Sequence, residues 1–225
     1  MNITAIDESL KFINEQYSDI LLTSNYINTK NKITWQTYKK GIYNRILYSK
    51  EYEMLLNERQ YSFLLKDKSF FQFYYEFEND ELNKAKLCYY PYPLNNNESD
   101  IELLEYLEES GSELLDIYYY GFNELLQHGI KSTNTSHIRF DYDKNVKSHS
   151  KSHIQYSGVN NVRIPMMHVF IPIIFFDFIV SHTVFSDNVL SKQKKTGYKK
   201  MIKQAEKIIL TMTEEKGIHI NYKPS

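Results

Sequence analysis

The chain of 225 residues contains one cysteine, five prolines, seven glycines and one tryptophan. Its single cysteine, Cys88, cannot form a disulfide within the chain and excludes metal sites built from several cysteines. The 20 tyrosines and 13 phenylalanines argue against disorder, because burial of aromatic side chains offsets the entropy lost on folding. We therefore expect a globular protein of a reducing compartment, the cytoplasm.

The sequence also lacks targeting and membrane signals. The N-terminus has no basic region followed by an apolar run, so no secretory leader is expected. Residues 164–180, IPMMHVFIPIIFFDFIV, are interrupted by His168, Pro172 and Asp177 and fall short of the roughly 20 apolar residues that cross a bilayer. We predict a buried core segment and no membrane association.

Three familiar catalytic signatures are missing from the sequence. It has no phosphate-binding glycine loop, no GxSxG nucleophile elbow and no HExxH metal pair. Any catalytic site must therefore come from residues that the fold brings together.

The formal net charge is only −1, but the charges are unevenly distributed. Residues 87–130 carry −9 and residues 144–203 carry +8. The two segments either face each other or solvent, or the basic one adjoins the site and attracts a polyanion. Within the basic segment, KKTGYKK at 194–200 interleaves lysine and tyrosine, as nucleic-acid contacts do, although a solvated helix start gives the same pattern.

Periodicity of apolar residues predicts an α+β fold in a single domain, with a helical N-terminal part at 1–60 and a sheet-and-helix core at 61–225. We expect an antiparallel sheet of about five strands packed against helices. Its strands come from a three-strand meander at 61–92 and a hairpin at 136–157. Helices are predicted at 7–22, 35–57, 100–109, 111–127, 172–185 and 197–215, with an edge strand at IHINY near the C-terminus.

The hairpin, SHIRFDYDKNVKSHSKSHIQYSG at 136–158, collects polar side chains of catalytic types. Side chains alternate along a strand, so His137, Arg139 and Asp141 share one face, and His153 and Gln155 share a matching face on the second strand. His149 lies in the intervening loop, and we expect it to matter less. Gln72 and Glu76 of the meander are candidates for the same cleft, but we expect them to face solvent.

These residue types suit two chemistries. In a phosphodiesterase, His137 and His153 would serve as base and acid, Arg139 would bind phosphate and Asp141 would orient an imidazole, with Gln155 beside them. Alternatively, His137, Asp141 and His153 would hold a divalent metal that activates water. A polar face on a half-solvated sheet also arises without any function.

The order SFFQFYYEF, AKLCYYPYP, SHIRFDYD, SHIQYSG and VRIPMM resembles an uncharacterised bacterial family, domain of unknown function 2290. The likeness runs from about Tyr61 to Phe185 and is strongest at HIRFDYD and the histidine that follows. It implies a bacterial protein of about this size and brings no activity, fold or catalytic residues with it.

Three functions are consistent with the sequence. The first is a nuclease or related phosphodiester hydrolase, of the kind found among bacterial defence or toxin effectors. The second is a non-catalytic subunit that binds nucleic acid or a protein partner encoded nearby. The third is a metal-dependent hydrolase of a small substrate. The sequence leaves the substrate, metal and oligomeric state open.

Overall fold

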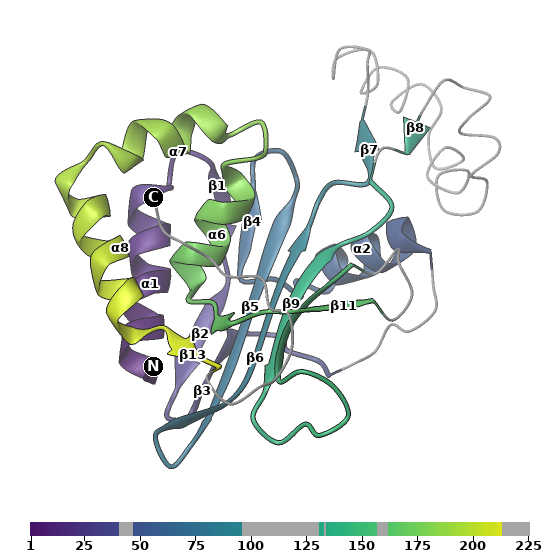
Figure 1. Cartoon of the computed structure of the whole chain (residues 1–225). Helices are drawn as coiled ribbons and strands as arrows, with labels where there is room; N and C mark the ends of the chain where they lie inside the picture. The colour runs from purple at the N-terminus through teal and green to yellow at the C-terminus, as the bar shows by residue number, and fades with distance from the viewer. Residues whose placement is uncertain (41–46, 96–130, 133, 157–161, 213–225) are drawn as a thin grey trace.

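The chain has an α+β fold, seen in a computed structural model that describes residues 1–40, 47–95, 131–132, 134–156 and 162–212 (Figure 1). The predicted helices at 100–109 and 111–127 and the predicted IHINY strand lie outside these residues, as do all nine acidic residues of the −9 segment. The described helices are α1 (Ile3–Gln16), α2 (Tyr48–Asn57), α6 (Pro172–Val180), α7 (Ser186–Gln193) and α8 (Thr196–Ile208).

An antiparallel sheet of nine strands forms the centre of the described structure. Its main path runs β1-β4-β5-β6-β9-β10-β11, and the β2–β3 hairpin joins it where β3 pairs with β5. The strands are β1 (Leu21–Ser24), β2 (Tyr26–Thr29), β3 (Lys32–Trp35), β4 (Phe63–Leu65), β5 (Phe70–Glu78), β6 (Glu81–Tyr90), β9 (Ile138–Asp143), β10 (Ser152–Tyr156) and β11 (Arg163–Pro165). Two short pairs lie outside it: β7 (Leu94–Asn95) with β8 (Lys131–Ser132), and β12 (His168–Val169) with β13 (Leu210–Thr211).

One face of the sheet is covered by a helical layer of α1, α6, α7 and α8 (Figure 1). The apolar helix α6 lies directly on the strands: the Phe71 ring is 4.8 Å from that of Phe176, and the Phe73 ring is 6.3 Å from that of Phe175. All four side chains are fully buried. The predicted core helix after Pro172 is confirmed, although it ends at Val180.

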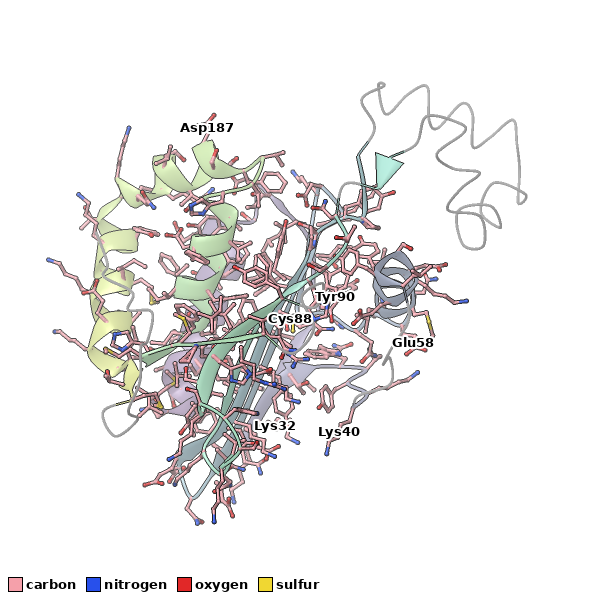
Figure 2. All side chains as sticks on the ribbon, turned by 45° about the vertical axis from the view of Figure 1, so that its right-hand side comes forward. Lys32, Lys40, Glu58, Cys88, Tyr90 and Asp187 are labelled. Carbon is pink, nitrogen blue, oxygen red and sulfur yellow. The ribbon has the colours of Figure 1, made fainter. Side chains whose placement is uncertain are left out.

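The opposite face carries a smaller apolar cluster beneath α2. Tyr48, Tyr52 and Leu55 of this helix pack against strand residues that include Phe70 and Tyr90. Figure 2 shows Cys88 and Tyr90 between the strands and α2, whereas Asp187 lies in the helical layer on the far side. The same face carries polar side chains beyond α2, among them Lys86 and Arg139.

A buried carboxylate connects the helical layer. Asp177 of α6 is 9% exposed and accepts hydrogen bonds from the hydroxyls of Tyr17, at 3.0 Å, and Tyr198. The amide of Gln193 lies 3.4 Å from the same carboxylate. The buried carboxylate of α6 is therefore hydrogen-bonded by residues that follow α1 or belong to α7 and α8. Without these partners, burial of a carboxylate would strongly destabilise the fold.

The N-terminal part is less helical than the sequence predicts. The first helix ends at Gln16 and α2 begins only at Tyr48, while β1, β2 and β3 lie between them. The β2–β3 hairpin closes through a two-residue turn, with Thr29 opposite Lys32. Its β-branched residues Ile27, Ile33 and Thr34 favour strands, and β3 is stabilised by pairing with β5.

Two other boundaries differ from expectation. The sheet has more strands than the five predicted, since the short strands β1, β2, β3 and β11 add to the meander and hairpin. Helix α8 ends at Ile208 because the chain turns extended to pair β13 with β12. No helix among the described residues is long and apolar enough to cross a membrane.

The hairpin should contribute to the core through Phe140, which is fully buried. We expect Phe140→Ala to lower the free energy of unfolding by about 3 to 5 kcal/mol, because truncation leaves a cavity beneath the helical layer. Denaturant titration measures this change. Phe178→Ala, at a side chain that is 41% exposed, is the matched control and should change stability much less. Equal effects would contradict the packing of the hairpin against the helices.

Candidate functional site

The hairpin places its polar residues on one face, as alternation predicts. In the pairing of β9 with β10, Asp141 lies opposite His153 and Arg139 lies opposite Gln155. Between them Phe140 lies opposite Ile154, and these two side chains point into the core. The core therefore fixes which side chains reach the other face.

The same face continues across β6 and β5 in two polar rows. One row, in register across four strands, is Tyr74, Lys86, Asp141 and His153. The adjacent row is Gln72, Cys88, Arg139 and Gln155. Directly opposite residues of an antiparallel sheet point to the same side, so the two polar rows form one continuous surface.

Arg139 is fixed by its neighbours in the hairpin. Its Nε donates to Oδ2 of Asp141 at 2.7 Å, and its Nη2 donates to Oε1 of Gln155 at 2.8 Å. A guanidinium has five N–H groups, so these bonds leave three without a partner among the described residues. Arg139 is thus oriented but still able to bind an anion.

His153 lies beside the same carboxylate. Its Nε2 is 3.7 Å from Oδ2 of Asp141, and its Nδ1 is 3.2 Å from the carbonyl oxygen of Ser150. A carbonyl only accepts, so the proton of the neutral ring is assigned to Nδ1 and the lone pair to Nε2. Burial lowers the pKa of His153, although the nearby Asp141 carboxylate acts to raise this pKa.

His149 also belongs to this corner of the site. Its ring packs edge-on against that of His153, with 4.8 Å between the centroids, and His153 itself is only 3% exposed. The two imidazoles are thus neighbours on this face. The expectation that His149 matters less than His137 and His153 stays a prediction.

His137 lies at the other end of the hairpin strand, in a separate cluster with α2. Its ring packs on Tyr90 at 4.6 Å, and its Nδ1 is 3.8 Å from Oε2 of Glu51, too far for a hydrogen bond. Burial lowers the pKa of His137 to about 4. Burial likewise raises the pKa of Glu51, against the effect of the hydrogen bond from the Tyr90 hydroxyl.

The structure does not bring the two predicted catalytic histidines together. His137 precedes Asp141 by four residues, about 13 Å along an extended strand, whereas His153 lies directly opposite Asp141. One substrate atom cannot contact both imidazoles. For the same reason His137, Asp141 and His153 do not converge on a metal, and no cluster of three or more potential His, Cys, Asp or Glu ligands occurs in the described part of the chain.

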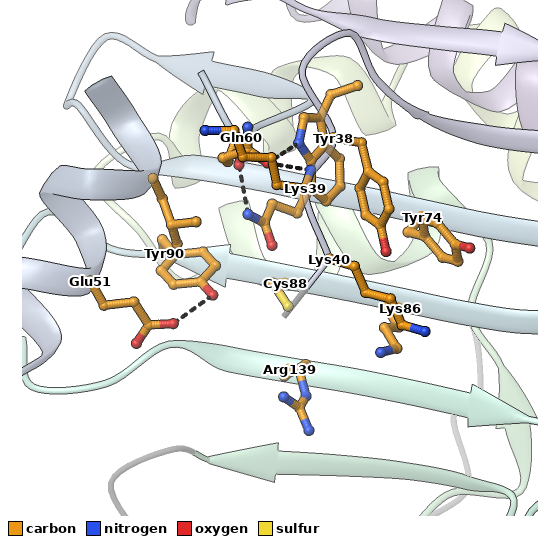
Figure 3. Close-up of a pocket in the computed structure, with 13 residues that line it drawn as sticks. Tyr38, Lys39, Lys40, Glu51, Gln60, Tyr74, Lys86, Cys88, Tyr90 and Arg139 are labelled. Atoms are coloured by element: carbon orange, nitrogen blue, oxygen red, sulfur yellow. Dashed lines mark hydrogen bonds between the residues drawn. The ribbon is translucent and has the colours of Figure 1, made fainter. Parts of the chain in front are cut away.

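A cavity of about 250 Å³ opens on the polar rows next to Arg139 (Figure 3). Trp35 at the end of β3 lines it together with Tyr38 and Lys40 from the segment that follows, and Lys86 and Cys88 line it from β6. These wall residues from the N-terminal part were not expected, because no local pattern relates them to the hairpin 100 residues later.

Three residues of β5 and β6 can be compared with what the sequence predicts for them. Gln72 does not face solvent: it is 8% exposed, lines the cavity and donates from Nε2 to the carbonyl of Gln60. Glu76 is half-buried and accepts from the Tyr74 hydroxyl. Cys88 is buried as expected, and burial raises the pKa of its thiol.

The +8 segment does not form one surface beside the hairpin. Six of its ten cations lie on or between α7 and α8, in the helical layer on the far side of the sheet (Figure 1). Tyr198 of KKTGYKK is buried, and its hydroxyl bonds to Asp177, so it cannot stack on a base. The other four, Lys144, Lys147, Lys151 and Arg163, lie in the hairpin or on β11, where Arg163 is opposite Gln155. Arg139, Lys86 and the lysines after β3 line the cavity.

Protonation of His137 should destabilise the fold. Its pKa is about 4 when folded against 6.5 as a reference, so the unfolded chain binds more protons between these values, and stability falls as pH drops from about 6.5 towards 4. The raised pKa of Glu51 acts in the opposite sense. We therefore expect the wild type to lose more free energy of unfolding than His137→Phe over this range.

Denaturant titrations across that pH range measure the difference, and NMR titration of the His137 ring measures its pKa directly. His182→Phe, at an exposed position, is the control and should follow the wild type. An unshifted His137 titration would contradict its burial against Tyr90 and Glu51.

Comparisons with known proteins give a family and no activity. No curated protein and no solved structure matches the chain. A family model described as an uncharacterised conserved protein, DUF2290, matches residues 15–222, which is nearly the whole chain and extends on both sides of the hairpin. The chain therefore belongs to the DUF2290 family.

Proposed function

We propose that this protein binds nucleic acid on the polar rows, with Arg139 as a phosphate ligand. The proposal rests on Arg139: Asp141 and Gln155 hold two N–H groups of its guanidinium, and its side chain lines a cavity that Lys86 also lines. An oriented guanidinium is well matched to phosphate oxygens.

The aromatic residues beside these cations favour a single strand. Tyr38, Tyr74 and Trp35 line the same cavity, and the half-buried Tyr38 has an accessible ring on which an unpaired base can stack, whereas the bases of a duplex are already stacked on each other. Cations for the backbone and aromatic rings for the bases are the two features that single-strand binding requires.

Phosphodiester hydrolysis is a second candidate, favoured by the contact of His153 with Asp141. The Nε2 lone pair would accept a proton from water as its oxygen bonds to phosphorus, and the bond to the leaving oxygen would break, with that oxygen taking a proton from solvent. Asp141 lies where it would stabilise the imidazolium, and Arg139 where it would stabilise charge on the phosphate. His137 takes no part in this scheme.

A non-catalytic role in a larger complex would use the same surface without the proton transfer. The burial of His153, which is 3% exposed, favours this alternative, since a catalytic base needs access to its substrate. The two candidates therefore share the binding site and differ in whether His153 is required.

Binding should depend on Arg139 and on salt. We expect a labelled single-stranded oligonucleotide to bind with an affinity that falls as salt rises, and Arg139→Gln to weaken binding roughly 10- to 100-fold, the effect of losing a charge-assisted hydrogen bond. The logarithmic salt slope should become shallower by about 0.7. Fluorescence anisotropy at several salt concentrations measures both.

Lys199→Ala on α8 is the control for that experiment, because it removes one exposed cation from the far side of the sheet. Thermal unfolding of each variant shows whether it is folded. If no strand binds at low salt, or if Lys199→Ala weakens binding as much as Arg139→Gln, the proposed interface is wrong.

Hydrolysis should depend on one histidine. If the protein cleaves RNA or DNA, His153→Ala should lower turnover by at least about 100-fold, the usual contribution of a general base. His137→Ala should leave turnover within a few-fold of the wild type. Gel-based cleavage assays with and without a chelator measure this, and full activity in His153→Ala would exclude the hydrolytic scheme.

A further inference from the structure

We infer that the cavity beside Arg139 binds a single nucleotide, with its base against the aromatic wall of Trp35, Tyr38 and Tyr74 and its phosphate on Lys40 and Lys86. This inference deepens the proposed function and takes its ligand class from it. It gives a ligand-binding role to cavity residues that lie outside the hairpin. The ligand is a nucleoside phosphate, either free or as one unit of a strand.

The aromatic wall is continuous. The rings of Trp35 and Tyr38 are 5.1 Å apart and nearly perpendicular, and those of Tyr38 and Tyr74 are 5.1 Å apart and stacked. Trp35 and Tyr74 are buried and support the half-buried Tyr38, whose ring remains partly accessible to a base. Base stacking on such a ring is tolerant of sequence, because every base has a π-face.

A buried glutamine holds this wall in place. Oε1 of Gln60, which is 1% exposed, accepts from the Trp35 indole at 3.0 Å and from the backbone N–H of Lys39 at 2.9 Å. Its Nε2 donates to the carbonyl of Thr37. The segment that carries the aromatic rings and the lysines is thus fixed before any ligand binds, which reduces the entropy lost on binding.

Two lysines at the cavity have no ion-pair partner among the described residues. Lys39 pairs with Glu58 at 2.8 Å, but neither Lys40 nor Lys86 lies within ion-pairing distance of a described carboxylate. Lys86 is next to Asp141 in its row, yet that carboxylate is engaged by Arg139. Figure 3 shows Lys40 and Lys86 extending to the side of the cavity where Tyr38 and Tyr74 lie.

The charge and size of the cavity select the ligand further. Among the described residues that line it, Glu51 is the one carboxylate, and burial disfavours its charged form. Four cations, Lys39, Lys40, Lys86 and Arg139, therefore dominate the lining, and Lys39 is paired with Glu58 outside it. A volume of about 250 Å³ suits one nucleotide, and it is too small to admit a double helix.

The single tryptophan of the chain provides a direct measurement, because Trp35 lines the cavity. Tryptophan fluorescence is recorded while the full chain is titrated with adenosine monophosphate, with inorganic phosphate and with a single-stranded oligonucleotide. We expect a saturable change with the nucleotide or the strand, and a much weaker response to inorganic phosphate, which cannot stack.

Variants test the two halves of the site separately. Lys40→Ala and Lys86→Ala should each weaken binding roughly 10- to 100-fold, and Tyr38→Ala roughly 5- to 150-fold, the range for loss of one base stack. Lys199→Ala is the matched control and should leave the titration unchanged. All these side chains are exposed or half-buried at the surface, and circular dichroism confirms that each variant is folded.

The outcomes separate this inference from the proposed function. A response to free nucleotide identifies a nucleotide pocket, and a response to the strand alone identifies a strand subsite; both support the inference. It is overturned if neither ligand changes Trp35 fluorescence, or if the lysine variants bind as the wild type does, even where Arg139-dependent strand binding persists. Nucleotide binding without strand binding would instead overturn the proposed strand interface while leaving the pocket intact.

Discussion

The register of the central strands is the constraint on which the site depends. Phe73, Leu87, Phe140 and Ile154 form a row in register across β5, β6, β9 and β10, and this row is buried under the helical layer. A slip of one residue would turn every side chain of a strand to the other face. Burial of the apolar row therefore determines which polar residues meet on the opposite side.

The positions of the site residues are consequently fixed by packing of the core. Lys86, Asp141 and His153 are neighbours because the residues adjoining them in sequence are packed between sheet and helices. Rigid strands hold functional side chains more accurately than loops do. The other side of the cavity is formed by the segment around Trp35, which is less regular than the strands. Gln60 holds this segment in place through hydrogen bonds to the Trp35 indole and to the backbone of Lys39.

Local patterns in the sequence were sufficient to predict much of this arrangement. Alternation in HIRFDYD and SHIQYS identified the faces of β9 and β10, and the apolar run after Pro172 identified α6 as a core helix. These predictions succeed because strand alternation and helix hydrophobicity are properties of neighbouring residues. The predicted convergence of Arg139, Asp141, His153 and Gln155 follows from the same alternation and is confirmed by the register.

Other features depend on information that alternation does not contain. Alternation assigns His137 and His153 to one face but says nothing of their positions along it, so their separation became apparent only with the strand register. Trp35, Tyr38 and Lys40 reach the hairpin face through the pairing of β3 with β5 and the path towards α2, which are long-range contacts. The β2–β3 hairpin itself was hidden because short polar strands give a weak periodic signal.

Asp177 has a consequence for the dynamics of the helical layer. Its carboxylate is satisfied by Tyr17, Gln193 and Tyr198, so displacing α8 alone would leave a buried negative charge short of donors. Partial opening of one helix is therefore unfavourable, and the layer should open as a unit. In hydrogen exchange, the amides of α6 and α8 would belong to one cooperative unfolding unit rather than fraying independently.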